Sequence, residues 1–147
     1  MKTIAILVLG LLGFTADNNH VSWQVKLVGK QAADAVVELE FTGKIDTKWY
    51  VYSSELQVDG PMPTKLTLET SDVYEVLGKI SPNKPKEKQD EIWGGKIHYF
   101  EKTAKLCQKI KIKKTGLING KLSGQACSNI DGMCMPFSVP FTLEVKY

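Results

Sequence analysis

Residues 21–27 read Val-Ser-Trp-Gln-Val-Lys-Leu, an alternation of apolar and polar side chains with a period of two. Because successive side chains of a β-strand point to opposite faces, this alternation predicts a strand with one buried and one solvent-facing side. The pattern returns in residues 37–45, 105–113 and 139–145. No segment beyond residue 16 shows a convincing helical period, so the regular parts of the chain predict β-strands.

Short turn signals separate these stretches. Residues 59–63, Asp-Gly-Pro-Met-Pro, contain two prolines that cannot donate to a sheet ladder, which predicts a loop. Residues 81–89 are rich in lysine and proline and predict a solvated connection, and Asn119-Gly120 predicts a hairpin turn. Pro140 predicts that the closing strand starts there or lies at a sheet edge. Eight or nine short strands with turns between them predict an all-β fold, an antiparallel β-sandwich.

Residues 49–52, Trp-Tyr-Val-Tyr, predict a short strand with its aromatic side chains on both faces. The alternation places Trp49 and Val51 on one face and Tyr50 and Tyr52 on the other. One face is expected to join the core. This leaves the two tyrosines side by side near a surface.

Residues 90–94, Asp-Glu-Ile-Trp-Gly, end the lysine-rich connection with two carboxylates followed by two large apolar side chains. Exposed apolar side chains of this size need a surface to cover. Ile92 and Trp93 are therefore expected either to pack on the core or to cover a site.

The bulk composition fits a single globular domain. The chain has 147 residues, of which 43% are hydrophobic and 24% charged, and this is long enough to bury its own core. The formal net charge is +3, and the lysines are spread over many segments and form no basic block. Nucleic acid is therefore not expected as a partner.

The first residues are typical of a secretory signal. Lys2 precedes a nearly unbroken apolar run from Ile4 to Phe14, which is too short to span a bilayer because a span needs about 20 residues. We expect a signal peptide at residues 1–16 and a single domain at residues 17–147, with no membrane span after signal removal. The alternative is a buried first strand or helix.

Two of the three cysteines, Cys127 and Cys134, flank a six-residue loop. The loop contains the turn formers Asn129, Asp131 and Gly132, so its ends can meet. Exported proteins fold in oxidising surroundings, where two neighbouring thiols form a disulfide unless they are reduced. A facing cysteine pair is therefore predicted.

Cys107 is the remaining cysteine. It has the same parity as the lysines of residues 105–113, so it is expected on the outer side of its strand. We predict a bystander thiol.

Three functions compete for the Cys127–Cys134 pair. Closing a loop of about eight residues stabilises a fold by roughly 2.5 kcal/mol in the chain-entropy model, which is small for a crosslink and mildly favours an exchangeable bond. One alternative is an interaction sandwich with an inert structural disulfide. Another is a secreted Cu(I) carrier, because Met133 and Met135 are soft ligands beside the cysteines and His98 is available to join them.

Three segments together resemble a known family. Trp49-Tyr50-Val51-Tyr52, Asp90-Glu91-Ile92-Trp93-Gly94, and Cys127 to Cys134 with Met135-Pro136 are similar to the N-terminal periplasmic domain of DsbD-type thiol:disulfide interchange proteins, which are protein-disulfide reductases. The resemblance covers nearly the whole chain after the signal. It implies an immunoglobulin-like β-sandwich with a reversible cysteine pair and no cofactor or metal. It also implies electron transfer from a separate membrane donor to thioredoxin-like periplasmic proteins.

The resemblance also implies a role for each site residue. Cys134 resembles the thiol that forms the mixed disulfide with partners, and Cys127 the thiol that resolves it. The implied surround of the pair comprises Tyr50, Tyr52 and Pro136, and the implied cap loop comprises Asp90, Glu91, Ile92, Trp93 and Gly94. The chain departs from the family pattern in three places: six residues separate the cysteines where four or five are usual, Phe137 replaces a second proline, and Ile92 replaces a larger phenylalanine lid.

Overall fold

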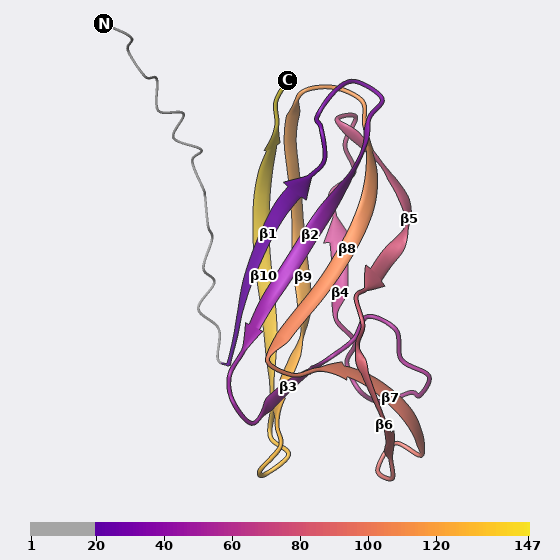
Figure 1. The fold of residues 1–147 in the computed structure, drawn as a ribbon, viewed down its shortest axis with the longest axis vertical. Helices are drawn as coiled ribbons and strands as arrows, with labels where there is room; N and C mark the ends of the chain where they lie inside the picture. The colour runs from indigo at the N-terminus through magenta and orange to yellow at the C-terminus, as the bar shows by residue number, and fades with distance from the viewer. Residues whose placement is uncertain (1–19) are drawn as a thin grey trace, which may run out of the picture.

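The structure is a computed structural model that describes residues 20–147, and the predicted signal peptide lies outside these residues. Residues 20–147 form ten β-strands arranged in two sheets (Figure 1). No helix in this part of the chain is long and apolar enough to cross a membrane. The strands are β1 (Val21–Val28), β2 (Val36–Ile45), β3 (Trp49–Tyr52), β4 (Lys65–Leu68), β5 (Tyr74–Pro82), β6 (Lys86–Asp90), β7 (Gly95–Phe100), β8 (Thr103–Ile112), β9 (Gly116–Ser128) and β10 (Cys134–Val145).

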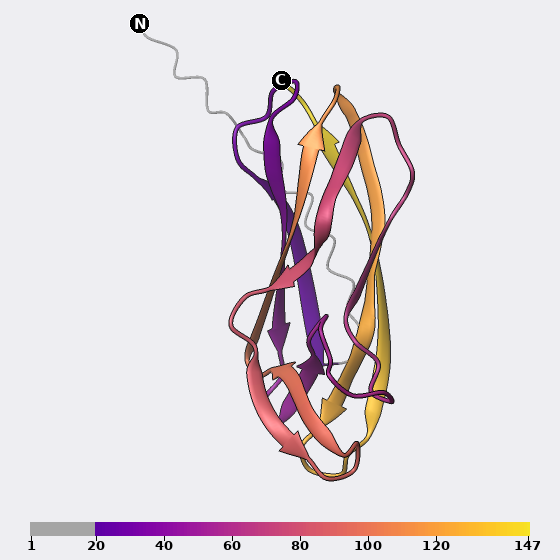
Figure 2. The ribbon, with the colours of Figure 1, turned by 90° about the vertical axis from the view of Figure 1, so that its right-hand side faces the viewer.

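The two sheets pack face to face (Figure 2). The smaller sheet has the strand order β1-β2-β8-β5, and the larger has the order β10-β9-β3-β7-β6 with β4 also paired to β9. All of these pairs are antiparallel. The predicted immunoglobulin-like antiparallel β-sandwich is confirmed, and Pro140 lies in an edge strand as expected.

The core between the sheets follows from the alternation in the sequence. In β8 the fully buried Leu106 and Ile110 alternate with lysines that face water. Phe41 of the smaller sheet meets Phe141 of the larger one edge-on, with ring centroids 5.4 Å apart. Each fully buried side chain of this size stabilises the fold by about 1.5–3 kcal/mol, so these contacts hold the two sheets together.

Cys107 lies on the outer face of β8, as its parity predicts. Its neighbours across the sheet are Glu40 of β2 and Ser81 of β5. Burial, followed by the nearby carboxylates Glu38 and Glu40, raises the pKa of the Cys107 thiol. A thiol with a raised pKa holds little thiolate at neutral pH and is a poor nucleophile.

The prediction that residues 81–89 form a solvated connection is wrong for most of this segment. Residues 86–90 form β6, which pairs with β7, and only residues 83–85 connect it to β5. The strand is stabilised by its backbone ladder and by polar contacts across it, because Glu87 lies 3.2 Å from Lys96 and 3.0 Å from His98. An edge strand of charged residues shows no apolar alternation, so its sequence resembles a loop.

The prediction of a hairpin turn at Asn119-Gly120 is also wrong, because both residues lie inside β9. The turn falls at residues 113–115 and ends at Gly116, whose φ is 150°. Gly120 serves close packing, since a Cβ there would lie 2.7 Å from the ring of Phe141 and 2.8 Å from Leu68.

Candidate functional site

The disulfide follows from the register of two neighbouring strands. Cys127 of β9 lies directly opposite Cys134 of β10, with Cα atoms 4.0 Å apart, and the two sulfurs are bonded. The next pair along the ladder is hydrogen-bonded, with Ser128 N donating to Met133 O at 2.8 Å. The cysteines therefore occupy a non-hydrogen-bonded position, where facing side chains of an antiparallel pair lie closest.

The six residues between the cysteines form an ordered hairpin tip. Ser128 Oγ accepts a hydrogen bond from Ile130 N, and Asp131 Oδ1 accepts one from Met133 N. The hydrogen bond from Met133 N first, and then one from the Ser128 side chain, lower the pKa of the Asp131 carboxyl. Asn129 N also donates to the carbonyl of Lys48, which anchors the tip to the turn before β3.

The two cysteines differ in exposure. Cys127 is fully buried, whereas Cys134 is exposed. Cys127 points away from the main core into a small second cluster on the outer face of the larger sheet, with Tyr50, Tyr52 and Ile97. Of the two cysteines, Cys134 is therefore the one that faces solvent.

The tyrosines lie in the same cluster as Cys127. Tyr50 is the cross-strand neighbour of Cys127, its ring packs edge-on against Tyr52 at 5.4 Å, and the two hydroxyl oxygens are 3.4 Å apart. The expectation that the tyrosines lie near a surface is wrong, since both are buried. Leu56 and Val58, from the segment between β3 and β4, cover them.

Burial governs the acidity of Tyr50. Burial first, then the hydrogen bond and charge of Tyr52, and last the charge of Asp90, raise the pKa of the Tyr50 hydroxyl above its usual value. Tyr50 is therefore a neutral hydrogen-bond donor beside the cysteine pair over the whole physiological range, and not a base.

The raised pKa predicts a pH-dependent loss of stability. Below about pH 10 both the folded and the unfolded chain hold the Tyr50 proton, whereas above it only the folded chain keeps that proton, so stability falls as pH rises. We expect Tyr50→Phe to lose less free energy of unfolding than the wild type between about pH 8 and pH 10.5. Urea unfolding at both pH values measures this difference. Tyr147→Phe, at an exposed position, is the control, and equal losses in wild type and Tyr50→Phe contradict the assignment.

Lys88 also lies at this site, although no pattern in the sequence indicates it. Its ammonium nitrogen lies 4.6 Å from the centroid of Tyr50 and 4.9 Å from that of Tyr99, both within the range of cation–π contacts. The position of Lys88 is not predictable from the sequence, because the charged residues of β6 resemble a loop. The sequence predicts that Ile97 and Tyr99 lie on one face of a strand. The pairing of β7 with β3 and β6 places that face beside Tyr50.

Asp90 organises the tip of the β6–β7 hairpin. Its Oδ1 accepts hydrogen bonds from the backbone nitrogens of Ile92 at 2.9 Å and Trp93 at 3.1 Å. The Gly94 nitrogen donates to the Asp90 carbonyl at 3.0 Å, and the φ of Gly94 is 72°. Glu91 is exposed at this tip. The cap loop is thus a hydrogen-bonded turn with a glycine in a left-handed conformation.

The structure places the cap loop at the same end of the molecule as the disulfide without burying Cys134 (Figures 1 and 2). Ile92 is 86% exposed. The Trp93 ring lies on Gly60, since a Cβ on that glycine would be 2.1 Å from it. The cap loop therefore packs on the β3–β4 segment in this arrangement. Pro136 lies two residues along β10 from Cys134 and is exposed.

Of the residues suggested for Cu(I), His98 does not lie on the face of the larger sheet that carries Cys127. His98 lies on the face of β7 opposite Ile97 and Tyr99, and its Nε2 contacts Glu87 at 3.0 Å. The sulfurs of Cys127 and Cys134 are bonded to each other, and Met133 is exposed. Within residues 20–147 no group of three or more His, Cys, Asp or Glu side chains is placed to hold a metal ion.

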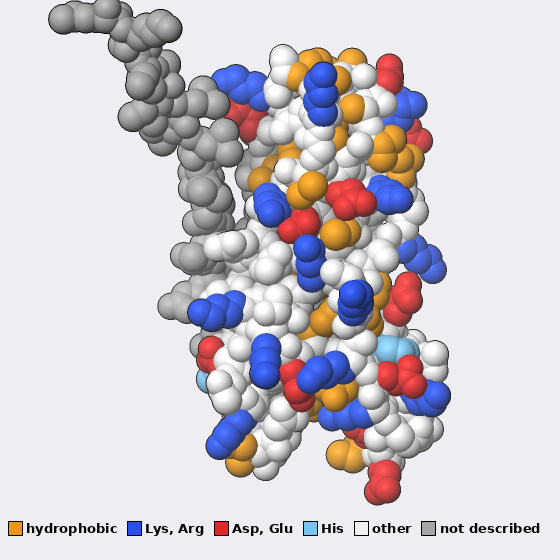
Figure 3. Space-filling model, viewed as in Figure 1, with side chains coloured by type: hydrophobic (Ala, Val, Ile, Leu, Met, Phe, Trp, Pro, Cys, Tyr) orange, Lys and Arg blue, Asp and Glu red, His pale blue; other side chains and the backbone are white. Residues whose placement is uncertain are grey.

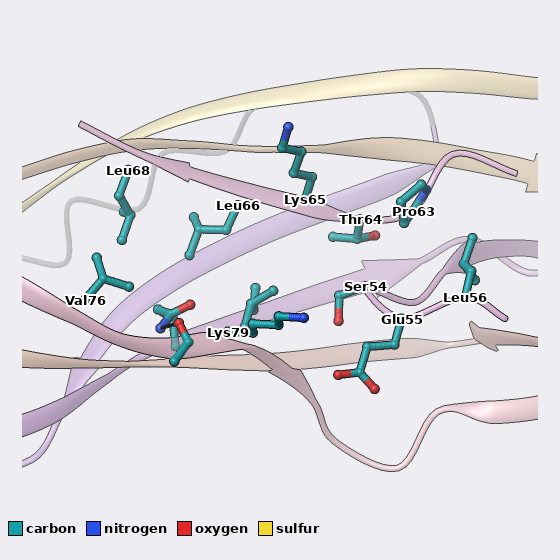
Figure 4. Close-up of a pocket in the computed structure, with 13 residues that line it drawn as sticks. Ser54, Glu55, Leu56, Pro63, Thr64, Lys65, Leu66, Leu68, Val76 and Lys79 are labelled. Carbon is teal, nitrogen blue, oxygen red and sulfur yellow. Dashed lines mark hydrogen bonds between the residues drawn. The ribbon is translucent and has the colours of Figure 1, made fainter. Parts of the chain in front are cut away.

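A groove of about 750 Å³ lies between β4 and β5, on the open side of the sandwich (Figure 4). Leu66, Leu68 and Val76 line one end, and Ser54 and Lys79 lie toward the other. The residues that line the groove include neither disulfide cysteine.

The chain matches the family described as "Thiol:disulfide interchange protein DsbD, N-terminal" over residues 20–146. The N-terminal periplasmic domain of ScsB from Proteus mirabilis has a similar structure, with TM-score 0.65 and 15% sequence identity, covering 88% of this chain and 48% of that one. A chain in the complex between the DsbD and PilB N-terminal domains from Neisseria meningitidis matches with TM-score 0.54 and 17% identity, covering 82% of this chain and 80% of that one. No curated protein matches the chain. At these identities the structural matches establish the fold.

Proposed function

Because this chain belongs to the family of DsbD N-terminal domains, we propose that it relays electrons through a reversible Cys127–Cys134 disulfide to thioredoxin-like partner proteins. The observation that carries the proposal is the unequal exposure of the bonded cysteines, with Cys134 open to solvent and Cys127 buried beside Tyr50 and Tyr52. An exchange disulfide needs one reachable sulfur and a protected neighbour that resolves the intermediate.

The reaction balances with the two cysteines and a partner disulfide. In the reduced domain the Cys134 thiolate attacks a partner sulfur, forms a mixed disulfide and releases the other partner sulfur as a thiolate. Cys127, after losing its proton, attacks the Cys134 sulfur, closes the domain disulfide and releases the second partner sulfur. The released sulfurs take up the protons, and two electrons pass to the partner.

The surrounding residues support each step of this proposal. The buried cluster holds Cys127 next to Cys134, so resolution needs only rotation of a side chain already in register. The neutral Tyr50 hydroxyl, which pairs with the Tyr52 hydroxyl, lies in the cluster that contains Cys127. The cap loop, with Asp90, Glu91, Ile92, Trp93 and Gly94, is the segment that would shield the pair when it closes from its position on Gly60.

The cellular setting is part of the proposal. We place the domain, residues 17–147, in the periplasm after removal of a signal peptide at residues 1–16. There it would act as the carrier component of a protein-disulfide reductase and receive electrons from a separate membrane donor. The complex of DsbD and PilB N-terminal domains is a precedent for pairing between this kind of domain and a second protein domain.

Trapping of the mixed disulfide tests this function. A Cys127→Ser variant cannot resolve the intermediate and is expected to accumulate a covalent complex with an oxidised thioredoxin-like protein through Cys134. Absence of any complex would favour the inert structural disulfide.

A further inference from the structure

Exposed apolar side chains gather at the disulfide end of the molecule. Among residues 20–147 the two most exposed large hydrophobic side chains are Ile92, 86% exposed, and Ile130, 74% exposed. Met133 and Trp93 are also exposed. These four side chains belong to two hairpin tips, the β6–β7 tip (residues 91–94) and the β9–β10 tip (residues 129–133).

The two tips project side by side at one end of the sandwich. Figures 1 and 2 both place them at the end opposite the chain's C-terminus. Figure 3 shows this end as two lobes with a hollow between them and hydrophobic side chains near the end of each lobe. Since Cys134 begins β10 directly after Met133, this exposed residue lies at the base of the β9–β10 tip.

The β9–β10 tip exposes two apolar side chains, Ile130 and Met133, to solvent. Ile130 and Met133 join neither hydrophobic cluster of the described residues, whereas the backbone at both positions is fixed by hydrogen bonds to Ser128 and Asp131. A rigid turn that presents apolar side chains to water is typical of an interaction surface.

Charge adds a further feature. Glu91 on one tip and Asp131 on the other are exposed carboxylates, while Lys48 is the basic residue at the anchor of the β9–β10 tip. The overall chain carries a net charge of +3, so the acidic β6–β7 tip differs from the average surface. A partner surface with an apolar centre and a basic residue at its rim would complement this end.

We propose that Ile130 and Met133 of the β9–β10 tip form a partner-docking surface together with Ile92 and Trp93, and that this surface takes a protein whose reactive cysteine is ringed by apolar side chains. The inference rests on the proposed function and adds the residues that choose the partner. A protein partner gains binding energy from both tips, whereas a small thiol reaches the Cys134 sulfur without touching them.

Rates of disulfide reduction by two reductants test the surface. The variant is Ile130→Ser combined with Met133→Ser, which keeps the backbone hydrogen bonds of the tip. The reductants are reduced thioredoxin, as a protein with an apolar-ringed cysteine, and dithiothreitol. We expect the rate with thioredoxin to fall about tenfold and the rate with dithiothreitol to change less than about twofold.

A matched double variant gives the control. Val36 and Leu117 are 56% and 52% exposed and lie at the other end of the sandwich, so Val36→Ser with Leu117→Ser should leave both rates unchanged. A thioredoxin rate of the tip variant within about twofold of the wild type would overturn the docking surface, as would equal losses with both reductants. Wild-type protein that dithiothreitol reduces but thioredoxin does not would instead overturn the proposed function itself.

Discussion

Replacing Cys127 by serine is expected to convert transient exchange into a stable covalent complex. The variant leaves Cys134 as an exposed thiol that still attacks an oxidised thioredoxin-like protein, but it removes the only sulfur that lies in register to resolve the mixed disulfide. With a partner variant that lacks its own resolving cysteine and carries its remaining cysteine as a mixed disulfide with thionitrobenzoate, Cys134 displaces thionitrobenzoate and most of the limiting protein should enter the complex. Non-reducing electrophoresis and intact mass measure the yield, and dithiothreitol should reduce the intermolecular disulfide and separate the two proteins.

The other two cysteines supply the controls for trapping. Cys134→Ser leaves only the fully buried Cys127 at the site and should give no complex. Cys107→Ser added to Cys127→Ser should leave the yield unchanged, because Cys107 lies on the outer face of β8 and the pKa of its thiol is raised by burial. A complex that disappears with Cys107→Ser, or one that Cys134→Ser forms equally well, would contradict the assigned roles.

Phe41→Ala is expected to be the most destabilising single substitution that leaves the site chemistry intact. Phe41 is 1% exposed, sits between Val25 and Leu106 on the neighbouring strands and meets Phe141 of the opposite sheet. Removing such a ring leaves a cavity between the sheets and costs about 3–5 kcal/mol of unfolding free energy. Denaturant unfolding of the oxidised protein measures the loss.

The control for Phe41→Ala lies on the same strand. Val36 is 56% exposed, so Val36→Ala should change the free energy of unfolding by less than about 0.5 kcal/mol. A loss below about 1 kcal/mol for Phe41→Ala would mean that the two sheets are not packed through this ring.

The sequence predicted the sandwich wherever alternation was strong. Strands such as β1 and β8 bury every second side chain against the opposite sheet, and the sequence records that directly. The sequence pattern does not predict β6, because this edge strand consists of polar and charged residues without apolar alternation. Its backbone ladder with β7 holds it in place. The pair Asn119-Gly120 is typical of a turn. In β9, however, Gly120 is required because Phe141 and Leu68 approach it closely.

The site could be predicted in part. The meeting of Cys127 with Cys134 depends on a short hairpin, and the position of Tyr50 beside Cys127 depends on one strand pairing, so local pattern and resemblance sufficed. The burial of the tyrosines under Leu56 and Val58 depends on the path of a long loop. The assigned roles of the cysteines and the cap loop stay predictions.

Contacts between the hairpin tips and the loops could not be predicted from the sequence, because they also depend on the path of long loops and on strand order. The seat of Trp93 on Gly60 joins segments more than thirty residues apart, and no periodicity encodes that distance. Lys88 lies over Tyr50 and Tyr99 only because β6 and β3 both flank β7. Such contacts follow from strand order, which a single sequence does not state.

The reduction potential of the Cys127–Cys134 bond tests the central claim most directly. Equilibration of the purified domain with glutathione or dithiothreitol redox buffers, followed by alkylation and mass analysis, gives the fraction reduced at each potential. An exchangeable bond predicts a midpoint clearly above about −300 mV, within reach of thioredoxin-like proteins. A midpoint at or below about −300 mV would identify an inert structural disulfide and contradict the account.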